Sequence, residues 1–267
     1  MPLSDGERTA GSTHVINGLH VEVAGDGPAV VLVHAGIADS RMWEPQWATW
    51  TAEYRVIRLD LREFGRLAAA TGAFCHAADV IAVLDALKVD RAVVVGASFG
   101  GLVSLDLAAS RTDRVVGLVL ADIPLPGHAW SAEFETFGDA ENAAIEAGDL
   151  DLATEINVDF WLGDAPESIR SAIREQQRRA FELQVGVEAE SSLFTEDLPD
   201  RLASLDVPTL VIDGANDVAD FRQIAAQLGR TIPRSERATI ARSGHLPSLE
   251  QPEAFDAVVR PFLARVV

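Results

Sequence analysis

Short apolar runs alternate with amphipathic segments along most of this 267-residue chain. Two of the runs, "AVVLVHAG" and "RAVVVG", are apolar on both faces, which is typical of central strands in a parallel sheet. Between them, apolar residues recur at helical spacing over 76–88. This alternation predicts βαβ units and a mostly parallel sheet with flanking helices. The predicted strands are 29–36, 54–62, 91–96, 115–122, 207–214 and 235–241, and the other predicted helices are 40–52, 99–110, 220–229 and 252–265.

The pattern changes in the middle of the chain. Residues 130–200 contain no strand-like run and favour helix, so we expect a helical domain inserted into the α/β core. Of the chain's net charge of −19, residues 122–200 carry −15, with 19 Asp or Glu and 4 Arg. The predicted parts are a flexible N-terminus at 1–13, a first part of the core at 14–122 with a hairpin turning at Asn17-Gly18, a helical insertion at 123–204, and a second part of the core at 205–267.

Composition and charge narrow the classes of partner. No apolar run approaches the roughly 18 residues of a membrane span, and the polar N-terminus lacks the apolar core of a signal peptide. The strong negative charge disfavours nucleic acid and anionic membranes. Cys75 is the only cysteine, and no His/Cys cluster has metal-ligand spacing. We therefore expect a cytoplasmic protein, monomeric or homodimeric, that acts on a small-molecule substrate without a metal or cofactor.

One serine stands in an unusually cramped turn. The stretch "VVVGASFGGL" places Ser98 between a buried strand and a helix, with Gly96 and Gly100 two residues away on either side. Such a turn exposes the hydroxyl at the carboxyl edge of the sheet, where the helix N-terminus favours negative charge. A serine hydroxyl is a poor nucleophile until a base removes its proton. The alternative is an ordinary strand–helix turn with a capping serine.

Candidates for the base and its acid partner follow later in the chain. His245 lies in "ARSGHLPSLEQPEAF", in a loop after the last predicted strand. In "VIDGANDV", Asp213 closes a strand and Asp217 lies in the loop beyond it. The loop acid is better placed to accept the second N–H of the imidazole, so Asp217 is preferred and Asp213 is the alternative. Each residue alone has an ordinary structural explanation, but the order Ser, Asp, His favours a catalytic triad.

These motifs resemble those of the α/β-hydrolase fold superfamily of ester-hydrolase-like enzymes. The similarity covers about residues 14–121 and 205–265 and rests on "VLVHAGIADSRMW", "VIRLDLREFGR", "VGASFGG", "VIDGANDV" and "SGHLPSLEQPEAF". The resemblance implies an α/β fold with a mostly parallel eight-stranded sheet flanked by helices, and it makes the insertion a helical lid. It also implies an oxyanion hole built from the backbone N–H of Phe99 and that of Gly36, with Ile37 as the next candidate.

The chain departs from the family pattern at two loop positions. The usual His-Gly pair reads His34-Ala35, and His34 is expected to brace the loop. Glu63 stands where the family commonly has Gly, and we expect the loop to tolerate this residue without directing its side chain into the pocket.

The insertion supplies the candidate pocket walls. Arg170, Arg174 and Arg178 share a predicted helix with three glutamates, so we expect a solvated ion-pair face there and not a receptor for a substrate carboxylate. The candidate pocket residues are Trp130, Phe134, Phe137, Phe160, Trp161, Phe181 and Phe194, together with Leu246 after the candidate base.

The leading hypothesis is a serine hydrolase that cleaves a small, neutral or apolar carboxylic ester or lactone through an acyl-enzyme. Serine at position 98 argues against the dehalogenases and epoxide hydrolases of this fold, which use an aspartate nucleophile. Three alternatives stay open: a non-hydrolytic enzyme (lyase, acyl transferase or cofactor-free oxygenase), a C–C bond hydrolase, and a ligand-binding receptor. Leu246 weakens the second, because those relatives usually place Trp after the catalytic His.

Overall fold

Eight strands form one sheet in the order β1-β2-β4-β3-β6-β7-β9-β10. The computed structural model describes residues 11–187 and 189–267, so most of the predicted flexible N-terminus at 1–13 lies outside the described residues. β1 and β4 each pair antiparallel with β2, and the other neighbours pair parallel. The predicted eight-stranded, mostly parallel sheet is therefore confirmed. Its strands are β1 Ser12–Ile16, β2 Leu19–Ala24, β3 Ala29–Val33, β4 Arg55–Leu59, β6 Ala92–Ala97, β7 Val115–Ala121, β9 Thr209–Gly214 and β10 Ser235–Ile240.

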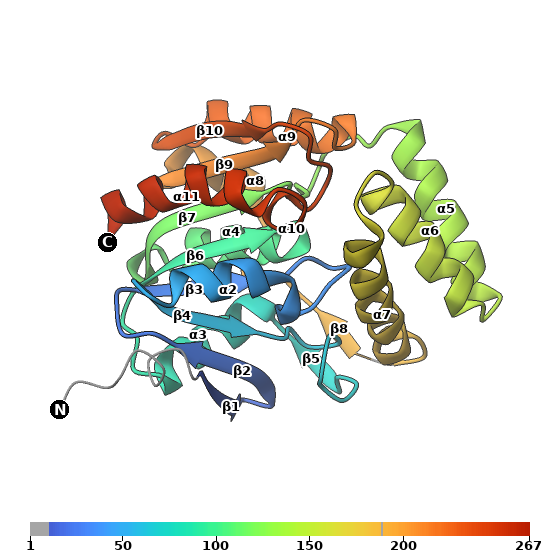
Figure 1. Cartoon of the computed structure of the whole chain (residues 1–267), viewed down its shortest axis with the longest axis horizontal. Coiled ribbons are helices and arrows are strands. Elements are labelled where there is room, and N and C mark those ends of the chain that lie inside the picture. Colours follow the sequence, from blue (N-terminus) through green and yellow to red (C-terminus); the bar gives the residue numbers. More distant parts are fainter. Residues whose placement is uncertain (1–10, 188) are drawn as a thin grey trace.

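Helices cover both faces of this sheet. Alternate residues of a strand point to opposite faces, so Val31 and Val33 of β3 join a buried cluster with α3, α4 and α9. Val30 and Leu32 join a second cluster with α2 and α11, which lie in front of the sheet in Figure 1. The helices of the core are η1 Ser40–Trp43, α2 Glu44–Trp50, α3 His76–Ala86, α4 Phe99–Ser110, η2 Thr112–Arg114, α8 Leu198–Arg201, η3 Leu202–Ser204, α9 Ala219–Thr231, α10 Pro247–Glu250 and α11 Pro252–Val266.

A separate group of helices stands beyond the carboxyl ends of the parallel strands (Figure 1). These are α5 Ala132–Glu146, α6 Leu150–Leu162 and α7 Glu167–Gln184, which we call the α5–α7 segment. The expectation that 130–200 contains no strand is wrong, because β8 Ala189–Ser191 pairs in parallel with β5 Gly72–Phe74. Strands of three residues are too short to show a periodicity. Within the described residues, no helix combines the length and the apolar character that crossing a bilayer requires.

The turn between β6 and α4 is held by direct backbone packing. Ser98 has a left-handed φ of 49° with ψ −122°. A Cβ atom on Gly100 would lie 2.2 Å from the carbonyl oxygen of His34, and one on Gly96 would lie 2.4 Å from the carbonyl oxygen of Gly100. Only glycine fits at these two positions, so α4 begins directly against β3 and β6, and the turn projects Ser98 from the edge of the sheet.

This packing predicts that Gly100→Ala lowers the free energy of unfolding by at least about 2–3 kcal/mol, since backbone atoms must move to admit the methyl group. The matched control is Gly138→Ala within α5, where nothing lies within 4 Å of the added Cβ. The control should stabilise the protein by up to about 1 kcal/mol through helix propensity. Urea unfolding measures both, and equal midpoints for the two variants would contradict the packing argument.

Candidate active site

The structure brings three of the predicted residues into one hydrogen-bonded chain. The Oγ of Ser98 lies 2.9 Å from Nε2 of His245, and Nδ1 of His245 lies 2.9 Å from Oδ2 of Asp217. His245 and Asp217 are buried, whereas Ser98 is partly exposed. With Nδ1–H donated to the carboxylate, Nε2 is free to accept the serine proton. The arrangement therefore fits a base between a nucleophile and an orienting acid.

Asp217, and not Asp213, is the acid partner of the histidine. Oδ1 of Asp217 accepts the N–H of Val218 at 2.8 Å, which leaves Oδ2 directed at His245. Asp213 points to the neighbouring strand, where it pairs with Arg237 at 2.8 Å and accepts the hydroxyl of Thr239 at 3.1 Å. The preference for the loop acid over the strand acid is therefore the correct one.

A second carboxyl group, which the sequence reasoning missed, lies beside this acid. Asp122 directly follows β7, is fully buried, and accepts the N–H of Gly214 at 3.0 Å. Burial and the neighbouring Asp217 carboxylate raise the pKa of Asp122 well above its ordinary value. This shift favours the neutral form of Asp122 beside Asp217.

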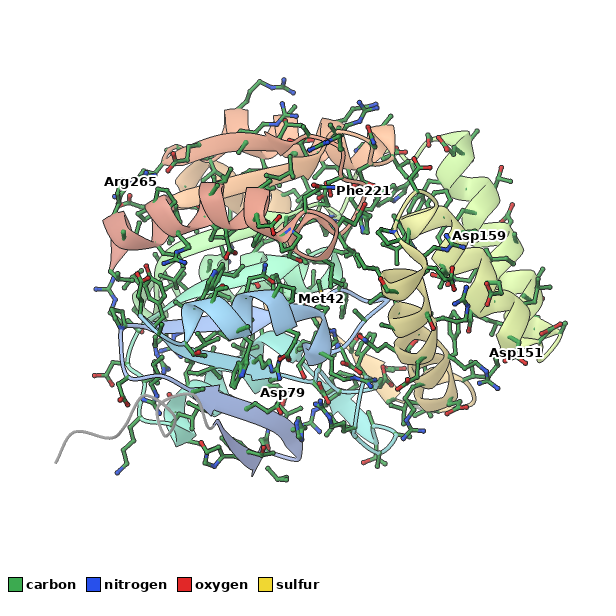
Figure 2. The ribbon with its side chains drawn as sticks, in the orientation of Figure 1. Met42, Asp79, Asp151, Asp159, Phe221 and Arg265 are labelled. Carbon is green, nitrogen blue, oxygen red and sulfur yellow. The ribbon has the colours of Figure 1, made fainter. Side chains whose placement is uncertain are left out.

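Two hydrogen bonds and two aromatic contacts hold the loop that carries His245. Glu250 accepts the N–H of Gly244 and the N–H of Leu246, each at 2.8 Å, and so clamps the two residues that flank His245. The ring centroid of Trp161 lies 4.1 Å from that of His245, and the centroid of Phe221 lies 4.5 Å away. Figure 2 labels Phe221 on the α9 side of the space between the core and the α5–α7 segment. These contacts hold the imidazole in one orientation and keep water from it.

Three backbone N–H groups near Ser98 are available to a ligand. Phe99 begins α4, and Gly36 and Ile37 follow β3 in a loop that lines the same cavity as Ser98. A Cβ on Gly36 would come within 3.3 Å of Cβ of Phe99, so this loop and the start of α4 lie in contact. Within the described residues, no backbone hydrogen bond uses the N–H of Phe99, Gly36 or Ile37. Phe99 is therefore one candidate donor to a ligand, and Gly36 and Ile37 are both candidates for a second.

His34 holds the loop from beneath, as the sequence predicted. The N–H of Leu61 donates to Nε2 of His34 at 2.9 Å, and Nδ1 lies 2.9 Å from the carbonyl oxygen of Ala35. The ring therefore carries its hydrogen on Nδ1. Complete burial lowers the pKa of His34, so it stays neutral.

A cavity of about 420 Å³ opens over Ser98. Four of the predicted aromatic residues line it: Phe134, Phe137, Trp161 and Phe181. Trp130, Phe160, Phe194 and Leu246, which were also predicted, do not line this cavity. They stand one layer behind it or apart from it: Trp130 stacks on Phe134, Phe160 stacks on Phe137, Phe194 is exposed, and Leu246 is buried in the core.

The cavity also has polar walls that the sequence reasoning missed. Glu63 lines it and adopts a left-handed φ of 68°, so the expectation that this side chain stays out of the pocket is wrong. Burial raises the pKa of Glu63. The remaining polar residues of the lining are His76, Glu141, Asn157, Gln177, Gln184 and Ser191. They come from five elements, α3, α5, α6, α7 and β8, and no local motif marks them.

The arginines of α7 form the expected ion pairs with Glu167 and Glu182 of their own helix, and they also pair with acids of the neighbouring α6, which was not predicted. Arg170 pairs with Asp159, and Arg178 pairs with Asp151, both on α6 and labelled in Figure 2. Arg174 pairs with Glu155 of the same helix. None of the three arginines lines the cavity over Ser98, so these charges tie α6 to α7.

Comparison with known proteins agrees with the fold and identifies the family. The sequence profile of the alpha/beta hydrolase family matches residues 30–258, which include Ser98, Asp217 and His245. A match over most of the chain shows the family, and the protein belongs to the alpha/beta hydrolase family.

Several relatives share nearly the whole length of the chain. It is 27% identical over 256 residues to 3-oxoadipate enol-lactonase 1 of Acinetobacter baylyi, covering 93% of this chain and 94% of the relative. It is 26% identical over 267 residues to carboxylesterase YbfK of Bacillus subtilis, covering 95% of this chain and 84% of the relative. The crystal structure of the enol-lactonase from Burkholderia xenovorans superposes with a TM-score of 0.78 at 25% identity, covering 95% of this chain and all of that one.

The buried His76 predicts a pH-dependent loss of stability. Burial lowers its pKa from 6.5 to about 4, so below about pH 6.5 the unfolded chain binds a proton that the folded protein does not. Relative to His76→Gln, the wild-type free energy of unfolding should fall by about 2 kcal/mol from about pH 7 to about pH 5. Urea unfolding of both proteins across this range measures the difference, and a difference independent of pH would contradict the neutral buried imidazole.

Proposed function

We propose that this protein is a serine hydrolase that cleaves a small, neutral carboxylic ester or lactone. The observation that carries the proposal is His245, which joins Ser98 and Asp217 through two contacts of 2.9 Å at the floor of a cavity. A hydroxyl, an imidazole and a carboxylate in this order form the arrangement that activates a serine for acyl transfer.

In the proposed reaction, Nε2 of His245 takes the proton of Ser98 while Oγ attacks the ester carbonyl carbon. Asp217 holds the ring in its Nδ1–H form and stabilises the imidazolium that results. His245 then gives the proton to the leaving alkoxide, and an acyl group remains on Ser98. Water attacks the acyl group as it gives a proton to the same nitrogen, and His245 then passes this proton to Oγ of Ser98 as the acid leaves, which restores the serine.

Hydrogen-bond donors positioned before the reaction stabilise the negative charge that develops on the carbonyl oxygen. The N–H of Phe99 is the first, and the N–H of Gly36 or Ile37 is the second. The position of Phe99 at the start of α4 adds the partial positive charge of the helix N-terminus. One such donor contributes about 3 kcal/mol to stabilisation of the transition state.

The character of the cavity supports a neutral substrate. Four aromatic side chains of the α5–α7 segment line it, and of the described residues that line it none is Lys or Arg, whereas two are Glu. The segment's net negative charge also disfavours an anionic substrate at long range. In this proposal the α5–α7 segment serves as the lid over Ser98. The enol-lactonase and carboxylesterase named among the relatives support ester or lactone cleavage.

The proposal predicts that wild type hydrolyses members of a panel of p-nitrophenyl esters and lactones, and that Ser98→Ala lowers kcat/KM by at least about 10³-fold. In ¹⁸O-labelled water, the acid product must carry one solvent oxygen. Product without the label would indicate a lyase or acyl transferase. Equal turnover by Ser98→Ala would contradict a serine nucleophile, and saturable binding without turnover would indicate a receptor.

The two aspartates of the β9 region give a matched test of the acid. Asp217→Asn should lower kcat by about 10³–10⁴-fold, because an amide stabilises the wrong tautomer of the imidazole and carries no charge. Asp213→Asn loses its pairing with Arg237 but leaves the imidazole untouched, so its kcat should fall less than about tenfold. Steady-state kinetics with the best ester of the panel measures both, and similar losses would refute the assignment.

A further inference from the structure

The polar side chains that line the cavity over Ser98 differ in whether they already have partners. Asn157 donates from Nδ2 to Glu141 at 2.7 Å, and its Oδ1 accepts the indole N–H of Trp161 at 3.3 Å. Gln184 donates from Nε2 to the carbonyl oxygen of Glu63 at 3.2 Å. These groups are satisfied by the protein itself, so they do not require a ligand.

Two groups in the same lining are buried without a partner. Oε1 of Gln177 and Nδ1 of His76 have no hydrogen-bond partner in the part of the chain that the structure describes. The residues are only 4% and 5% exposed, so bulk solvent does not take the place of a partner. An orphaned buried acceptor lowers stability, so each such group needs an explanation. Of the seven buried side-chain atoms without a partner among the described residues, only these two belong to residues that line the cavity over Ser98.

The neighbouring Gln176 differs from Gln177 in this respect. Oε1 of Gln176, one residue away and equally buried, accepts the N–H of Asp39 at 2.9 Å. Gln176 ties α7 to the loop after β3, whereas Gln177 faces the cavity. The two side chains are therefore a matched comparison: Oε1 of Gln176 has a hydrogen-bond partner within the protein, and Oε1 of Gln177 has none among the described residues.

The hydrogen-bonding chemistry of Gln177 and His76 restricts which ligand groups can bind to both. Oε1 of Gln177 can only accept, so the ligand must donate a hydrogen bond. His76 is neutral near pH 7 because burial lowers its pKa to about 4, so its ring offers one donor and one acceptor. A hydroxyl satisfies both kinds of group, whereas a carboxylate cannot donate and would lie in a cavity with two glutamates. The two glutamates of the lining would offset the charge of an ammonium group, but that group carries only donors and cannot accept from the ring N–H of His76, so it completes the two groups less fully than a hydroxyl does.

We propose that Gln177 and His76 form a specificity subsite for an uncharged hydroxyl group carried by the substrate at a distance from its ester bond. This inference rests on the proposed hydrolase function and refines its substrate class from a neutral ester or lactone to a hydroxylated one. In this proposal the aromatic walls contact the carbon chain of the substrate, and Gln177 binds the hydroxyl group at its far end. Removal of Gln177 Oε1 should therefore affect hydroxylated substrates alone.

The test uses ester pairs that differ only at the distal end. One series consists of p-nitrophenyl esters of straight acyl chains from about four to about eight carbons, ending in methyl, hydroxymethyl, amino or carboxylate groups. A second series carries the same endings on the alcohol part of acetate esters. At the best length in at least one series, wild type should show a kcat/KM for the hydroxylated ester at least about tenfold above that for the methyl-ended ester.

The variants separate recognition from structure. Gln177→Met keeps the volume and removes the amide, so it should bring the ratio of hydroxylated to methyl-ended ester close to one. Gln176→Met is the matched control: it loses the bond to Asp39 and should lower stability or the turnover of both esters together, with the ratio unchanged. His76→Phe, which removes both ring nitrogens, is the second variant, and it should also reduce the ratio if Gln177→Met fails to fold.

The outcomes distinguish the subsite from the reaction. Serine-dependent hydrolysis without preference for the hydroxyl, or with preference for the methyl, amino or carboxylate ending, overturns the subsite and leaves the hydrolase proposal standing. A hydroxyl preference that persists in Gln177→Met and His76→Phe also overturns it. If wild type hydrolyses no ester faster than Ser98→Ala does, the proposed function fails and the subsite fails with it.

Discussion

The direct packing of the start of α4 against the backbone of β3 is the constraint on which the site depends. Gly100 lies so close to the His34 carbonyl that no side chain fits between the two elements. The N–H of Ser98 donates to the carbonyl oxygen of Ala121 on β7 at 2.8 Å, and its own carbonyl accepts from Leu102 at 3.1 Å. The serine is thereby fixed with a left-handed φ, and the surrounding sheet compensates for that strain.

The order of the strands in the sheet places the other residues of the site beside Ser98. β6, β7, β9 and β10 are successive neighbours, and each is followed by a residue of the site: Ser98, Asp122, Asp217 and His245. Because the carboxyl ends of parallel strands meet at one edge, residues scattered over half the chain converge there. The α5–α7 segment closes the same edge and supplies both the aromatic walls of the cavity and Trp161 against the imidazole.

Much of this could be predicted from the sequence, and the exceptions have a common physical cause. Central strands, the helices after them and the order Ser, Asp, His are set by local periodicity and turn chemistry. The lining of the cavity instead depends on how the α5–α7 segment is rotated against the core, which no local pattern encodes. The sequence thus indicated the right aromatic segment, but Trp130 and Phe160 lie one layer behind the cavity, and Gln177 and His76 gave no signal.

The most direct measurement of the central claim is reaction with a fluorophosphonate, followed by peptide mapping by mass spectrometry. A serine activated by His245 in a prepared oxyanion site should be phosphonylated at Ser98 alone, and prior denaturation should abolish the reaction because the folded sheet edge creates the reactivity. An unlabelled folded protein, or a label that maps to another serine, would contradict the account.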